Sequence, residues 1–128
     1  MARQSMRSPL ARASGLGSAK EGVEHWWRER LTGVALIPLA LWFIASMIMH
    51  GGDDYIAITA WLREPFSTLM MVLLLAAVFH HSALGLQVII EDYVHSSIKI
   101  LALVIMRFGC SALAAASILA VLRVALSG

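Results

Sequence analysis

Charged residues are scarce in this sequence, and their scarcity excludes an ordinary soluble domain. The 128 residues include ten basic and eight acidic side chains, whereas 59% are hydrophobic, and the mean hydropathy is +0.78. One domain of this size cannot bury so much apolar surface, so lipid must cover part of it. The net charge is only +2, and without a basic stripe we expect no nucleic-acid partner. The single cysteine, Cys110, excludes an internal disulfide.

Long apolar runs are what the sequence has instead of charge. Residues 31–49 and 65–90 contain no Asp, Glu, Lys or Arg, and residues 100–122 contain only Arg107. Each run is about as long as the ~20 residues that a helix needs to cross the hydrocarbon. We therefore predict an all-α integral membrane protein with three transmembrane helices. The predicted parts are an N-terminal tail (1–22) and one membrane domain (23–128), with spans at about 31–50, 65–90 and 98–123.

The distribution of basic residues predicts the orientation. Six of the ten precede the first span, and Lys99 follows the second, whereas only Arg63 and Arg123 flank the opposite ends. This asymmetry places the N-terminus in the cytoplasm and the C-terminus in the periplasm. The first twenty residues contain no acid and many Arg, Ser and Ala residues, as mitochondrial transit peptides do. We expect a cytoplasmic tail and a multi-pass protein of the bacterial inner membrane, with the mitochondrial inner membrane as the alternative.

Two histidines lie deep in the second apolar run. His81 and Asp92 are eleven residues apart, close to three helical turns, so they share a face and lie roughly 16 Å apart along the axis. If Asp92 marks the interface, His81 lies near the middle of a hydrocarbon layer about 30 Å thick. An imidazole at that depth needs a partner. It either ligates a haem, for which Gly85 leaves room one turn away, or bonds Ser46 or Ser111.

The other histidines cannot complete such a haem site. His80 is rotated by about 100° from His81 on the helix, so both cannot bind one iron from the same side, and we expect one of the two to be structural. His25, His50 and His95 lie at or beyond the ends of the spans. The second axial ligand of a six-coordinate haem b must therefore come from another chain, which predicts a complex.

Further polar residues lie toward the predicted cytoplasmic side. Tyr93 is either an interfacial aromatic anchor or a hydrogen-bond donor to a quinone carbonyl, with Asp92 beside it. Arg30 precedes the first span, where a basic side chain could pair with haem propionates. Arg107 either faces a partner subunit or extends to the cytoplasmic interface. The sequence alone leaves these alternatives open.

Two segments resemble the D-type hydrophobic membrane anchor subunit of succinate dehydrogenase (respiratory complex II). They are GVEHWWRERLTGVALIPL (22–39) and HSALGLQVIIEDYV (81–94). The first fits the family's His-Trp followed by Arg-x-Thr. The second fits its haem-ligating His, Gly four residues later, and Asp-Tyr at eleven and twelve. The resemblance covers the chain from about residue 22 to the C-terminus.

The resemblance implies an anchor that carries no catalytic head of its own. A second anchor (cytochrome b) subunit would supply the other haem histidine, and an iron–sulfur subunit and a flavoprotein would bind on the cytoplasmic face. Electrons from succinate would pass through FAD and the clusters to ubiquinone, in the respiratory chain and the tricarboxylic acid cycle. The resemblance makes His81 the axial ligand of the iron of haem b, Arg30 a neighbour of its propionates, Tyr93 the quinone donor and Asp92 part of the quinone site.

Two other functions compete with this interpretation. A small transporter or channel subunit could use a midplane histidine to relay protons, but it should also have ionisable residues along a path, and no acid lies within a span. A purely structural anchor, with neither haem nor quinone, is the third possibility.

Overall fold

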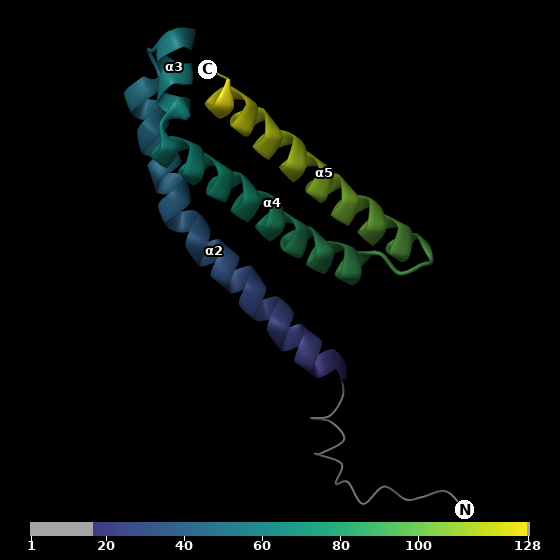
Figure 1. Cartoon of the computed structure of the whole chain (residues 1–128). Coiled ribbons are helices and arrows are strands. Elements are labelled where there is room, and N and C mark those ends of the chain that lie inside the picture. The colour runs from purple at the N-terminus through teal and green to yellow at the C-terminus, as the bar shows by residue number, and fades with distance from the viewer. Residues whose placement is uncertain (1–16, 128) are drawn as a thin grey trace, which may run out of the picture.

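The computed structural model describes residues 17–127, and within this range every regular element is a helix (Figure 1). The order is α2 (Gly17–His50), α3 (Tyr55–Arg63), α4 (Pro65–Tyr93) and α5 (Ile98–Leu126). Three helices are long and apolar enough to cross a membrane: Gly22–His50 within α2, and the whole of α4 and α5. The prediction of an all-α protein with three membrane-spanning helices is confirmed. The N-terminal tail was predicted to cover residues 1–22. Residues 1–16 lie outside the described part of the chain, and residues 17–22 belong to α2.

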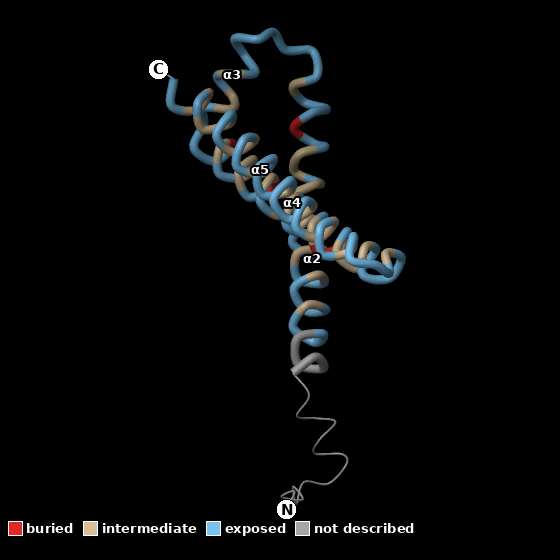
Figure 2. Tube along the Cα trace, turned by 90° about the vertical axis from the view of Figure 1, so that its right-hand side faces the viewer, coloured by how far each residue is buried: buried red, intermediate tan, exposed pale blue. Residues whose placement is uncertain are grey.

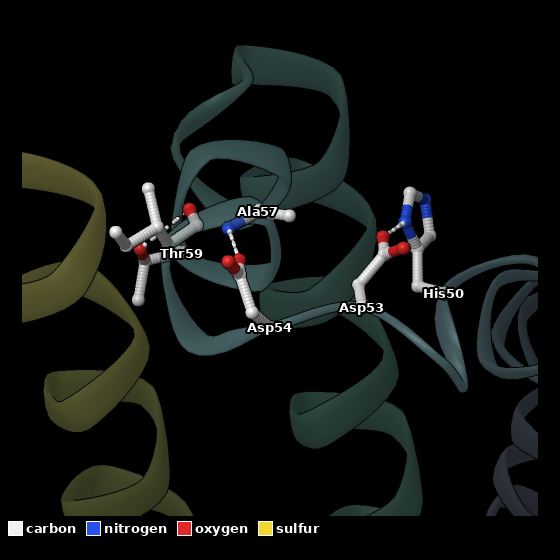
Figure 3. A network of polar contacts seen from close by, with 6 residues as sticks. His50, Asp53, Asp54, Ala57 and Thr59 are labelled. Carbon is white, nitrogen blue, oxygen red and sulfur yellow. Dashed lines mark hydrogen bonds and ion pairs between the residues drawn. The ribbon is translucent and has the colours of Figure 1, made fainter.

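The segment between the first two spans contains the short helix α3, which the three apolar runs did not predict. Asp54 caps α3 by accepting a hydrogen bond from the Ala57 backbone N–H at 2.8 Å (Figure 3). Asp53 holds the preceding turn through its carboxylate, which lies 2.6 Å from Nδ1 of His50. Gly51 is required there, because a Cβ atom at this position would lie 2.8 Å from the Met47 carbonyl oxygen. The turn therefore places α3 over the end of the bundle.

Proline and a short connection define the second and third spans. Pro65 occupies the first turn of α4, where its missing N–H costs nothing. After Tyr93 the chain leaves the helix with Val94 in an extended conformation. Lys99 then donates to the Glu91 carbonyl at 3.0 Å and ties the start of α5 to the end of α4. The result is an antiparallel hairpin of α4 and α5 (Figure 1).

Helix α4 is the centre of the arrangement, since it packs against α2, α3 and α5. The C-terminus of α5 lies beside α3, where Arg63 donates to the Val124 carbonyl at 3.2 Å and to the Ser127 hydroxyl at 3.4 Å. This end is opposite to the N-terminal end of α2 (Figure 1). The two ends of the described chain therefore lie on opposite sides of the bundle, as three crossings require. That the N-terminal side is cytoplasmic stays a prediction.

Very little of the chain is buried by the chain itself (Figure 2). Among the residues whose burial is described, only Ser46, Ser67, Leu74 and Leu84 are buried. Two of the four are serines, and such small residues let helices approach closely in a membrane. Ser46 satisfies its hydroxyl by donating to the Trp42 carbonyl at 2.8 Å. Many large apolar side chains of the three spans are exposed, so the described chain does not cover them itself.

Candidate functional site

His81 is held by a residue of another helix. Its Nδ1 atom, on α4, lies 3.0 Å from the Thr32 hydroxyl oxygen on α2. Both side chains are partly buried. The structure shows no bond from His81 to the alternative partners expected from the sequence, Ser46 and Ser111. Ser46 donates within its own helix, and Ser111 lines another groove, together with His80.

The ring of His81 borders a groove on the outer face of α2, which we call the His81 groove. Its volume is about 450 Å³. Its lining consists of Trp26, Glu29, Arg30, Gly33, Val34, Ile37 and His81. Four of these, Trp26, Arg30, Val34 and Ile37, are exposed, so the groove is open on one side.

Arg30 and His81 share this groove although they are far apart in the sequence. The Arg30 guanidinium lies 4.2 Å from the centre of the Trp26 ring, a cation–π contact that keeps the charge on the rim. A guanidinium is the side chain best suited to a carboxylate, because its donors form a planar fork. The groove thus presents one imidazole and one fixed cation, which are the groups that an iron porphyrin with anionic side chains needs.

Two glycines lie near His81, one on α2 and one on α4. A Cβ atom on Gly33 would lie 3.4 Å from Cε1 of His81, so a longer side chain there would fill the groove. A Cβ atom on Gly85 would meet nothing within 4 Å. Gly33 thus lets the His81 ring lie against α2, and the open space at Gly85 leaves room for a flat group, so the residues present fit a haem on this criterion. Within the described residues no three His, Cys, Asp or Glu side chains converge on a metal site.

His80 points into a different groove from His81. This second groove has a volume of about 830 Å³ and lies between α2, α4 and α5. Its lining is largely apolar and includes Leu73, Cys110 and Ser111 beside His80. The adjacent histidines are therefore separated by the packing, as their helical rotation predicts. His80 makes no side-chain hydrogen bond to any residue that the structure describes.

Asp92 and Tyr93 lie away from the His81 groove, at the end of α4. Tyr93 is 81% exposed, and Asp92 is exposed as well. By the rise of an α-helix, Tyr93 is roughly 18 Å along the axis from His81.

Arg107 has a side-chain partner within the chain, which neither alternative drawn from the sequence included. Its guanidinium donates to the Gln87 side-chain oxygen at 2.9 Å, and Gln87 in turn donates to Glu91 at 2.8 Å. These residues line a polar pocket of about 450 Å³ together with His25, whose Nε2 atom is buried and has no hydrogen-bond partner within the described chain. Gln87 lies four positions before Glu91, which is about one helical turn, and this spacing was the available sequence signal for their contact. Arg107 thus lies toward the end of the bundle at which α4 ends and α5 begins.

Comparison with known proteins gives this geometry its context. The family described as "Succinate dehydrogenase/Fumarate reductase transmembrane subunit" matches residues 4–122. The chain belongs to this family. It is a multi-pass membrane protein, by this membership and by its three spanning helices.

Individual members of the family are similar over most of their length. The succinate dehydrogenase hydrophobic membrane anchor subunit of Rickettsia conorii is 32% identical over 89 residues, which is 69% of this chain and 71% of that protein. The subunit of the same name from Paracoccus denitrificans is 30% identical over 110 residues, 85% of each chain. The succinate dehydrogenase membrane anchor subunit of Reclinomonas americana is 29% identical over 79 residues, 59% of this chain and 66% of that protein. No solved structure matches the chain at a significant level.

Proposed function

We propose that this chain is a membrane anchor subunit of a succinate:quinone oxidoreductase that ligates haem b through His81 and contributes to the ubiquinone site through Tyr93. Family membership supports the anchor role. The observation that carries the haem assignment is the His81 groove, where an imidazole and the Arg30 guanidinium lie on one open face. Nε2 of His81 makes no hydrogen bond to the described residues, so it is free to bind iron.

Each residue in the groove has a separate task in this proposal. His81 would hold the haem iron through a ring nitrogen, and Arg30 would neutralise a propionate at the rim. Gly33 lets the His81 ring lie against α2, and Gly85, one turn from His81 on α4, leaves space open. A second anchor (cytochrome b) subunit closes the open side and supplies the other axial histidine. A bound haem b would supply a one-electron carrier within the membrane.

Tyr93 and Asp92 serve the quinone in the same proposal. The Tyr93 hydroxyl is exposed and has no partner in the described chain, so it is available to donate a hydrogen bond to a quinone carbonyl. Asp92 beside it supports the site and can help to deliver protons. An iron–sulfur subunit and a flavoprotein on the same side, here taken as cytoplasmic, complete the path from succinate. The membrane in question is the inner membrane of a bacterium.

A difference spectrum of the purified complex tests the haem assignment. His81→Ala should abolish the low-spin haem b signal in the reduced-minus-oxidised spectrum, because it removes an axial ligand. His80→Ala is the matched control, one residue away on another groove, and should leave the signal intact. Assembly should survive both changes, since packing comes from many contacts.

The outcomes separate the competing functions. A haem spectrum that survives His81→Ala and disappears with His80→Ala would overturn the choice of ligand. A complex that assembles with succinate-oxidising subunits but has no haem would be a purely structural anchor. A chain that does not purify with such subunits at all would leave the transporter alternative as the explanation of its midplane histidines.

A further inference from the structure

Thr32 is placed to control which nitrogen of His81 carries a proton. Its hydroxyl oxygen lies 2.8 Å from the Arg28 carbonyl and 3.0 Å from the Glu29 carbonyl, both in the preceding turn of α2. The same oxygen lies 3.0 Å from Nδ1 of His81 on α4. It therefore joins a fixed piece of helix backbone to the ring.

Counting protons decides the direction of these hydrogen bonds. A hydroxyl has one proton, and carbonyl oxygens can only accept. If Thr32 donates to the backbone, its oxygen is left to accept from an Nδ1–H group, and two hydrogen bonds are made. If Thr32 donates to an unprotonated Nδ1, the carbonyls lose their bond and only one is made. The first arrangement satisfies more groups in a partly buried place, and it requires the tautomer protonated on Nδ1.

We propose that Thr32 is a positioning residue, which accepts a hydrogen bond from Nδ1–H of His81 and so keeps Nε2 unprotonated and aimed for axial ligation of an iron. The inference rests on the proposed haem-binding function and adds to it the residue that prepares the ligand. A ligating histidine commonly donates its other ring N–H to an acceptor, which fixes the tautomer and ring orientation and raises the basicity of the ligand.

The choice of threonine fits this role. The hydroxyl is anchored to the Arg28 carbonyl, and the β-branched side chain has few accessible rotamers in a helix. Gly33 follows directly and lies against the same ring, where its missing side chain lets α2 approach. Thr32 is thus a rigid acceptor at the crossing of α2 and α4, and it does not itself face the groove that would hold the porphyrin.

The test is a set of substitutions in the purified complex. Thr32→Val keeps the shape and removes the acceptor, whereas Thr32→Ser keeps the acceptor. Thr59→Val is the matched control, because Thr59 makes the same pair of backbone bonds, at 2.9 Å to the carbonyls of Tyr55 and Ile56, and no hydrogen bond to a histidine among the residues that the structure describes. The readouts are haem content per flavin, the low-spin fraction in the electron paramagnetic resonance spectrum, and the midpoint potential of the haem.

Thr32→Val should lower haem retention and raise the midpoint potential, because a less basic ligand stabilises ferric iron less. Loss of such an outer contact typically changes metal affinity by about 10- to 100-fold. A tenfold change in the ferric-to-ferrous affinity ratio corresponds to about 59 mV. Thr32→Ser should restore the wild-type values, and Thr59→Val should not change them.

The possible failures are distinguishable. If His81→Ala removes the haem signal but Thr32→Val retains wild-type haem content, low-spin fraction and potential, the role of Thr32 is wrong and the ligand assignment stands. If His81→Ala leaves the haem signal unchanged, the proposed function itself fails. If Thr32→Val does not assemble, Thr32→Ala gives the same reading with less bulk at the crossing, and wild-type spectra in that variant overturn the inference.

Discussion

Tyr93→Phe isolates a single hydroxyl that the chain itself does not use. Tyr93 is 81% exposed and makes no hydrogen bond to any described residue, so its removal costs this subunit nothing in folding. If partner chains enclose the site and the hydroxyl donates to a quinone carbonyl, its loss should cost about 1–3 kcal/mol. Each 1.36 kcal/mol is a factor of ten in rate. We therefore expect succinate–quinone turnover to fall by about 5- to 150-fold.

The chain provides an unusually close control for this experiment. Tyr55, its only other tyrosine, is 79% exposed and lies at the opposite end of the bundle, at the start of α3. Tyr55→Phe makes the same chemical change at nearly the same exposure and should leave quinone turnover unchanged. Both variants should keep wild-type haem content, because Tyr93 is roughly 18 Å along α4 from His81.

Two assays of one preparation separate the quinone from the rest of the path. The first follows ubiquinone reduction by succinate, and kcat or KM for quinone should carry the loss. The second uses an artificial acceptor that takes electrons directly from the soluble subunits, and it should be unaffected. Wild-type quinone turnover in Tyr93→Phe, or an equal loss in Tyr55→Phe, would reduce Tyr93 to an aromatic anchor of the membrane interface.

Two further predictions concern topology and the groove. A reporter fused after Gly128 should lie on the non-cytoplasmic side, and one inserted within residues 92–97 on the cytoplasmic side; a cytoplasmic C-terminus would contradict the predicted orientation. Gly33→Ala should retain haem, because its Cβ would make an ordinary contact with His81 at 3.4 Å. Gly33→Leu should lose it by filling the groove, and equal haem content in the two variants would show that the porphyrin lies elsewhere.

The spans could be predicted from the sequence because a bilayer imposes a simple length rule. Runs without charge at 65–90 and 31–49 fall inside α4 and α2. The short helix α3 was missed because its nine residues are too few to cross the membrane and follow a polar turn. Its signal was present in Asp54, a favourable N-cap residue directly before an apolar run.

The side-chain partners could not be predicted in the same way. Helical periodicity placed His80 and His81 on different faces, and the structure confirms that they border different grooves. Which residue meets His81 depends on where α2 crosses α4, and Thr32 is 49 residues away in the sequence. No local pattern encodes that crossing point. The bond from Arg107 to Gln87, 20 residues apart, was missed for the same reason.

The scarcity of buried residues bears on how stable the subunit is in the cell when its partners are absent. In a bilayer the hydrophobic effect does not drive apolar helices together, because lipid tails are as apolar as the helices. Close packing and a few polar bonds must therefore hold them together. With only Leu74, Leu84 and two serines buried among the residues described, this chain supplies little of that packing alone. We expect a copy synthesised without its partners to open readily and to be degraded by membrane proteases. Its abundance should then follow the supply of the other subunits, and recombinant production should require their joint expression.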